Sequence, residues 1–222
     1  VFGLHSRFRS HSWNMFLLGE ARSDVFGGTP FGGEATQGME RFPYNTLNAE
    51  NPGISGFGDL YQNINQMNLF ISRTLHTDVL TESARNYYLG QVYGLRAYYM
   101  YQLYRSWGDV VFTEEPSLGF EVGKLAKAAT PAAEIFEQVK KDIESSLSYF
   151  GSDYTIKEKK SLWSKAATLM LKADVYLWSA HRDGGEGDAR TAKNALVDIQ
   201  NNISRSNLDL MDTYQGVFAY DN

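Results

Sequence analysis

The chain has 222 residues and a mass of 25.0 kDa, enough for one large domain that buries about 70% of its unfolded surface. Hydrophobic residues make up 43% of the chain and charged residues 21%, which is ordinary globular usage and excludes general disorder and a fibrous repeat. The formal net charge of −5 works against a large phosphate-neutralising surface, so nucleic acid is not expected as a partner.

The absence of cysteine excludes disulfides, thiolate metal sites and thiol catalysis. The sequence has no run of 18 apolar residues, and its first residues, 1–5, lack the basic and apolar regions of a signal peptide. Because it does not begin with Met, we expect a fragment of a longer protein. Aromatic residues amount to 14% of the chain, more than a helical core needs, and some should lie at surfaces.

Two helices are predicted in the first half, over 59–80 and 82–105. The first begins with Asp59 as an acidic cap, with Gln62 placed to return the hydrogen bond. Its apolar stripe comprises Leu60, Ile64, Met67, Ile71 and Leu75. The second helix is apolar nearly all round and carries a stripe of small residues, Gly90, Gly94 and Ala97. We therefore expect it to pack on two sides, with one neighbour at close approach.

Three further helices are predicted over 131–150, 162–181 and 189–204. The first of these has Thr130 as a capping hydroxyl, Pro131 at the first helical position and Gly151 as its stop. The five helices predict an all-α fold of tetratricopeptide-like stacked helical hairpins with long irregular loops. The repeat spacing is degenerate, so ordinary helix packing without a true repeat stays open as the alternative.

Two segments interrupt this scheme. Residues 24–58 hold eight glycines, three prolines and five aromatic residues, and a loop of that length is usually a binding element, a lid or disordered. Residues 107–130 form a second excursion, in which 109–113 is a short β-prone run.

Motifs for catalysis and for cofactors are missing. A nucleophile elbow is excluded at 53–56, because the second Gly comes one residue too early. A phosphate loop is excluded at 119–124, because the segment is one residue too short. The four histidines lack zinc-binding spacing. The acidic turn 183–188 could hold calcium but lacks the EF-hand spacing, and a plain connecting turn capped by Asp188 is favoured. We expect no cofactor and no metal.

An enzyme with dispersed carboxylates stays an alternative, because any two of the 26 acidic residues could converge on a glycosidic bond. Nothing in the sequence singles out such a pair. The aromatic richness suits a hydrolase subsite and non-catalytic sugar binding equally, since rings stack on the apolar faces of pyranoses in both.

The order of several motifs resembles the SusD/RagB family of outer-membrane lipoproteins, which capture glycans for TonB-dependent transporters. The motifs are Gly19-Glu20-Ala21-Arg22-Ser23-Asp24, the runs 60–68, 95–99 and 103–111, the Ala-rich run 166–177, and 192–199. In the family, Pro usually stands where this chain has Val111. Each motif alone is weak, and their order and spacing together carry the resemblance over most of the chain.

The resemblance implies a non-enzymatic, surface-exposed glycan-binding protein of polysaccharide utilisation and nutrient uptake. It further implies a SusC-like TonB-dependent transporter as partner and a Gram-negative outer membrane reached only through a lipid anchor absent from this chain. Family members are much longer, so residues 1–222 are expected to be a single SusD-like N-terminal helical domain. The lipidated Cys, the first helices and the C-terminal half are then expected to lie outside it.

The motif residues are interpreted as structural. Arg96, Arg105 and Asp109 are expected to make buried or capping polar contacts, and Tyr61, Asn68 and Trp107 to pack. Sugar contacts are placed instead in the segment 13–44. The expected stacking residues are Trp13, Phe31, Phe42 and Tyr44, and the expected hydrogen-bonding residues are Asn14, Arg22 and Asp24. An interaction module that binds a protein or peptide between its helical hairpins, with no sugar involved, is the alternative function.

Overall fold

The computed structural model describes residues 1–23, 25, 41–50, 52–53, 56–119, 126–206 and 211–218. Over these residues the chain is all-α, with a tetratricopeptide-like arrangement of helical hairpins, as predicted. The long helices are α3 (Gly58–Leu75), α4 (Glu82–Trp107), α6 (Ala132–Phe150), α7 (Lys165–Ser179) and α8 (Gly185–Asn201). The shorter ones are α1 (Phe2–Ser10), α2 (Ser12–Leu18), the 3-10 turns η1 (Glu20–Arg22), η5 (Glu158–Lys160) and η7 (Ile203–Arg205), the π-helical turn η6 (Ala180–Gly184), and α9 (Tyr214–Val217).

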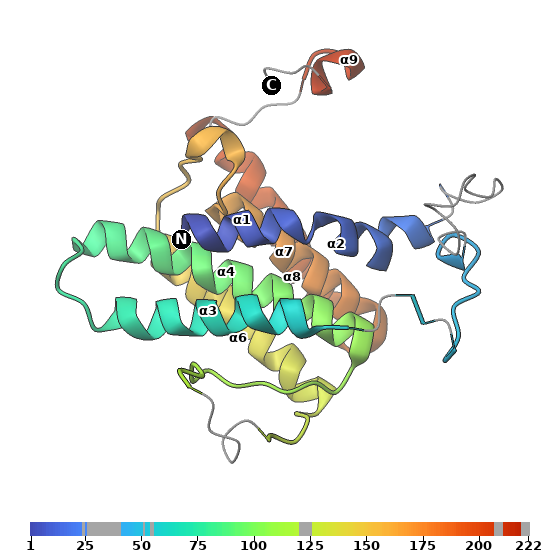
Figure 1. Cartoon of the computed structure of the whole chain (residues 1–222). Coiled ribbons are helices and arrows are strands. Elements are labelled where there is room, and N and C mark those ends of the chain that lie inside the picture. Colours follow the sequence, from blue (N-terminus) through green and yellow to red (C-terminus); the bar gives the residue numbers. More distant parts are fainter. Residues whose placement is uncertain are drawn as a thin grey trace.

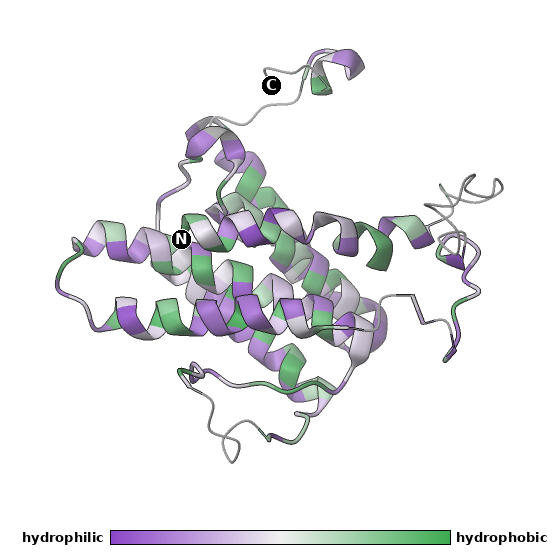
Figure 2. Cartoon of the chain, viewed as in Figure 1, coloured by the Kyte–Doolittle hydropathy of each residue, from purple (hydrophilic) through white to green (hydrophobic). Residues whose placement is uncertain are grey.

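Helix α4 is the centre of the fold. It pairs with α3 on one side and with α6 on another, and it also touches α7, which forms the next hairpin with α8. Figure 1 shows α1 and α2 following one another end to end along the α3–α4 hairpin. Hydrophilic and hydrophobic residues are interleaved along the long helices (Figure 2). Among the described helices, none combines the length and the apolarity needed to cross a bilayer.

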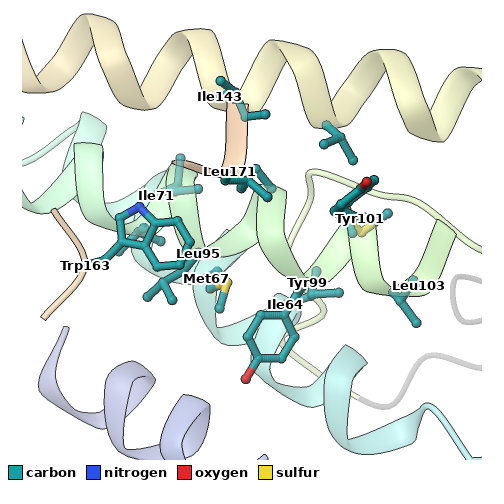
Figure 3. Packing of buried hydrophobic residues seen from close by; sticks show 14 of the residues in the cluster. Ile64, Met67, Ile71, Leu95, Tyr99, Tyr101, Leu103, Ile143, Trp163 and Leu171 are labelled. Carbon is teal, nitrogen blue, oxygen red and sulfur yellow. The ribbon is translucent and has the colours of Figure 1, made fainter. Parts of the chain in front are cut away.

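The main core lies where α3, α4, α6 and α7 meet. Figure 3 shows Met67 from α3 and Leu95 from α4 beside the indole of Trp163, with Ile143 and Leu171 arriving from α6 and α7. The stripe predicted for α3 is buried through Ile71, whereas Leu75 is largely exposed. The long apolar side chains predicted to face inward therefore build one continuous core.

Close packing of α4 depends on its small residues, as predicted. A Cβ on Gly90 would lie 2.9 Å from the ring of Phe150, and one on Gly94 would overlap the indole of Trp163. The hydroxyl of Ser146 occupies the same contact zone, donating to the Gly90 carbonyl oxygen at 2.6 Å. Larger side chains here would push α6 and α7 away from α4.

Several helix ends differ from the sequence expectation. Helix α3 stops at Leu75 rather than 80, because the hydroxyl of Thr77 accepts the Val79 N–H at 3.3 Å and favours a turn. Its N-cap is Phe57, which makes no side-chain capping bond, so the cap predicted at Asp59 is wrong and Asp59 lies inside the first turn.

The start of α6 is capped from a distance. The helix begins at Ala132, and the Ala132 N–H donates at 2.8 Å to the carboxylate of Asp109 in the preceding excursion. Thr130 instead forms a single antiparallel bridge with Val110, the one part of the β-prone run 109–113 that pairs among the described residues. Gly151, with φ of 52°, ends α6 as predicted.

The acidic turn 183–188 is not a plain connection. Gly185, with φ of 54°, reverses the chain in one residue, and α8 starts there instead of at 189. Glu186 and Asp188 are thus in the first turn of α8, where negative side chains are favourable. In the described part of the chain, no three His, Asp or Glu side chains gather as a metal site would require.

Candidate functional site

A cavity of about 310 Å³ opens where the end of α2 meets the ends of α4 and α7. Its walls comprise Leu18, Gly19, Arg22, Leu47, Pro52, Gln102, Arg105, Ser106, Trp107 and Trp178. Its size falls in the lower part of the range of small-molecule sites, roughly 300–1,000 Å³. The lining combines two indoles with guanidinium, amide and hydroxyl groups, which is the composition expected of a site for a hydroxyl-rich ligand.

Arg22 is the predicted site residue that the structure brings into this cavity. The 3-10 turn η1 places it directly after α2, and its Nε donates to the Oδ1 of Asn45 at 3.0 Å. This bond ties the α2 side of the cavity to the turn at 41–46, which is closed by the Thr46 N–H donating to the Arg41 carbonyl at 3.0 Å. Tyr44 belongs to that turn and is 43% exposed.

Trp13 and Asn14 lie in the first turn of α2, about 7 Å along the helix axis from the cavity-lining residue Leu18. Trp13 is 55% exposed and stacks one face on Phe16, with ring centroids 5.3 Å apart. Asn14 is half-buried. Both residues lie on α2, and neither lines the cavity itself.

Phe42 has a supporting position rather than an exposed one. It is 5% exposed and packs with Leu17 and Ala21 in a small core of its own. The chain passes over its ring at Gly53, where φ is 72° and a Cβ would lie 2.6 Å from the ring. The ring of Phe42 therefore holds the cavity wall and presents no free face for stacking. Asp24 and Phe31 lie outside the described residues.

The C-terminal ends of α4 and α7 supply site residues that sequence reasoning missed. Arg105 donates to the Oε1 of Gln102 at 3.0 Å and lies 4.0 Å from the carboxylate of Asp174. Its guanidinium lies over Tyr101, 4.6 Å from the ring centroid, and 5.9 Å from that of Trp178. These contacts fix the direction of Arg105 along the cavity rim.

Trp178 is half-buried, and its Nε1–H has no hydrogen-bond partner within the described protein. The guanidinium of Arg182, in the π-helical turn after α7, lies 4.4 Å from its ring centroid. An unpaired buried N–H beside a cavity is a costly feature, which a water or ligand oxygen would relieve. The signal available in the sequence was Arg105 and Trp107 close to the end of α4 and Trp178 close to the end of α7.

Burial of the family-like motif residues shows what those motifs do. Arg96 forms a bidentate pair with Asp142, with both N···O distances 2.7 Å, and donates to the Oδ1 of Asn68 at 2.8 Å. Asn68 in turn donates to the Thr113 carbonyl at 2.6 Å, and the Tyr61 hydroxyl donates to that of Val111. Burial raises the pKa of Tyr61 to about 12. For Arg96, Asn68 and Tyr61 the structural interpretation is confirmed, because they join residues 111–113 to α3, α4 and α6, whereas Arg105 and Trp107 line the cavity described above.

A second cavity, of about 320 Å³, lies beneath that excursion, between α3 and residues 111–117. Three of its polar side chains, Tyr61, Asn65 and Asn68, already bind the backbone that covers it. Asn65, for example, donates to the Ser117 carbonyl at 3.1 Å and accepts from the Ser117 N–H at 2.7 Å. We therefore place the candidate site in the cavity beside α2, which the guanidinium-bearing residues Arg22 and Arg105 line.

Comparison with known proteins gives one family. The model of a SusD-like family, described as starch-binding and associating with the outer membrane, matches residues 41–177. NanU of B. fragilis shares 51% identity and superimposes with a TM-score of 0.88, covering 100% of this chain and 43% of that one. A SusD superfamily protein from Bacteroides vulgatus ATCC 8482 shares 46% identity with a TM-score of 0.87, covering 100% and 44%.

A curated relative shows the same relationship at the sequence level. SusD-like protein P38 of Formosa agariphila is 34% identical over 113 residues, which are 50% of this chain and 20% of that protein. The chain thus spans less than half the length of these relatives.

Proposed function

Since this chain belongs to the SusD-like family, we propose that it binds glycans without cleaving them, as part of a longer outer-membrane protein that delivers them to a TonB-dependent transporter. The observation that carries the proposal is the cavity beside α2, which joins two indoles to arginine, amide and hydroxyl donors. Indole faces pack on the apolar faces of pyranose rings, and these donors suit ring and hydroxyl oxygens. The family description, starch-binding and associating with the outer membrane, supports the same ligand class and location.

Binding without catalysis is supported by the charge of the cavity. Glycoside hydrolysis ordinarily uses two carboxylates that flank the scissile bond. Of the described residues that line the cavity, none is Asp or Glu. Asp174, which does not line the cavity, has its carboxylate 4.0 Å from the guanidinium of Arg105.

The proposal is tested by native-gel affinity electrophoresis of the chain across neutral and acidic polysaccharides. We expect one glycan class to retard the chain, and retardation to weaken at least about tenfold in apparent affinity on Arg22→Ala, since truncating a central binding residue costs about 2 kcal/mol. Arg9→Ala is the matched control, because Arg9 is an exposed arginine on α1 that does not line the cavity. A folded chain that no polysaccharide retards would refute the proposal.

The outer residues of the site are tested separately. We propose that Trp13 and Tyr44 stack on sugar units that extend beyond the cavity, with Asn14 hydrogen-bonding beside Trp13. Trp13→Ala combined with Tyr44→Ala should weaken retardation by long polysaccharides more than binding of short oligosaccharides. Tyr214→Ala removes an even more exposed aromatic ring elsewhere and serves as control. Unchanged retardation in the folded double variant would remove these residues from the site.

A further inference from the structure

His5 on α1 is buried, with 2% of its surface exposed, and it joins two segments 158 residues apart. Its Nδ1 lies 3.1 Å from the carbonyl oxygen of Val1, and its Nε2 lies 2.8 Å from the backbone nitrogen of Trp163. A carbonyl oxygen only accepts and a backbone N–H only donates. The proton must therefore be on Nδ1, and Nε2 must present a lone pair, so this geometry requires a neutral imidazole.

Protonation of His5 would turn its contact with Trp163 from a bond into a clash of two N–H groups. The charged side chain that acts on the ring is that of Arg9, a cation. From the opposite side, Trp163 offers a neutral N–H. Burial lowers the pKa of His5 below its usual value, and Arg9 adds to this against the opposing effect of the bond to Val1.

Trp163, to which His5 bonds, is connected by hydrogen bonds to three helices. The Trp163 indole donates to the hydroxyl of Thr168 on α7 at 2.8 Å. The Thr168 hydroxyl lies 2.8 Å from that of Ser146 on α6, which donates to the Gly90 carbonyl of α4. His5 thus attaches α1 to the point where α4, α6 and α7 meet.

Helix α1 leads directly into α2, whose last turn lines the candidate cavity. The residue between the two helices, His11, is also buried, and its Nδ1 lies 2.7 Å from the hydroxyl of Tyr99 on α4. Burial lowers the pKa of His11 too, with Asp59 of α3 opposing and Arg7 of α1 assisting that shift. Because either the ring or the hydroxyl can donate in this contact, His11 lacks the strict requirement that His5 has.

We propose that His5 is a proton-sensitive latch: its neutral ring holds α1 on the Trp163 junction, and protonation releases α1 and loosens the α2 wall of the cavity. The latch itself does not depend on the ligand, and only its consequence for glycan binding rests on the proposed function. A histidine whose pKa is lower in the folded chain than its unfolded value of about 6.5 contributes full stability above that pH. That contribution is lost between pH 6.5 and the lower pKa of the folded chain. Over this window, the equilibrium constant for release of α1 rises by no more than about tenfold for each pH unit.

The test is amide hydrogen exchange of Trp163 in the 222-residue chain between pH 7.5 and 5, expressed as protection relative to the intrinsic rate at each pH. We expect protection to be constant above about pH 6.5 and to fall by up to about tenfold per pH unit below it. The His5→Gln variant should lose this dependence. His76→Gln, which removes an exposed histidine at the end of α3, should retain it.

A second measurement needs no variant and no ligand. Imidazole nitrogen NMR of the unsubstituted chain should show a neutral His5 with an unprotonated Nε2 at pH 7.5. A protonated Nε2 at that pH would overturn the latch, as would Trp163 protection that does not change with pH. An equal fall in His5→Gln would assign the effect to another group, such as His11, and would also overturn it. A chain that binds no glycan changes none of these outcomes.

Discussion

Asp142→Asn removes the charge from an ion pair that is among the most deeply buried contacts of the described residues. Arg96 and Asp142 each have 2% of their side-chain surface exposed. The guanidinium gives the carboxylate two hydrogen bonds of 2.7 Å, and Gln138 adds a third at 3.0 Å. The asparagine keeps the shape of the side chain, but only its oxygen accepts a hydrogen bond. Its NH₂ group would face an N–H donor of Arg96.

The expected loss in the free energy of unfolding depends on the Arg96 charge that remains after the substitution. The Arg96 charge remains buried, and among the described residues the opposite charge left beside it is Glu114, 65% exposed and 3.4 Å away. Breaking a buried pair by removing one partner costs about 3–5 kcal/mol, because an uncompensated charge is left in the interior. For a chain of this length, each kcal/mol corresponds to about 2–4 °C in Tm, so Tm should fall by roughly 6–20 °C.

Urea unfolding of the variant and the unsubstituted chain, followed by circular dichroism, measures this difference directly. Glu144→Gln is the matched control, because it neutralises the half-exposed partner of Lys172, and its expected cost is below about 1 kcal/mol. A loss of less than about 1 kcal/mol in Asp142→Asn would refute the claim that Asp142 compensates the buried charge of Arg96.

Two further changes test other parts of the packing. Gly94→Ala should lower the free energy of unfolding by about 1–3 kcal/mol, because the added Cβ overlaps the Trp163 indole. Gly3→Ala is the control and should not destabilise, because its Cβ meets no atom within 4 Å. Equal losses for the two variants in urea unfolding would contradict the close approach of α4 to Trp163. Asp109→Ala should cost about 0.5–2 kcal/mol through loss of the acceptor for the Ala132 N–H, and unchanged amide exchange in the first turn of α6 would show that this cap is unimportant.

The long helices could be predicted because their apolar stripes repeat over several turns. In α3 the stripe enters the core from Leu60 to Ile71, and in α6 the regularly spaced Phe136, Val139, Ile143 and Phe150 do the same. Helices α1 and α2 were not predicted, because both are short and bury few side chains, and α1 is rich in Ser, Arg and His. Their position depends on contacts such as His5 with Trp163, which no local pattern reveals.

Helix starts were less predictable than helix bodies, for a related reason. Thr81 and Ser164 cap the helices that follow them through their own hydroxyls, at 3.3 and 3.2 Å. Helix α6 is capped by Asp109, 23 residues upstream. A capping rule based on adjacent residues finds the first kind and misses the second.

The candidate site divides in the same way. Arg22 could be named because it lies in a motif beside an aromatic, glycine-rich segment. Gln102 and Trp178 could not, because they reach the cavity from the ends of two helices that meet only in the fold. Phe42 was wrongly predicted to stack on a ligand, since composition cannot separate an aromatic ring that supports a cavity wall from one that contacts a ligand.

The most direct test of the proposed site is a crystal structure of the chain with the oligosaccharide that best competes for polysaccharide binding. The account predicts a sugar ring in the cavity between α2 and the ends of α4 and α7, packed on Trp107 or Trp178, with hydroxyl oxygens within hydrogen-bond distance of Arg22 or Arg105. An oligosaccharide bound anywhere else on the chain would contradict it.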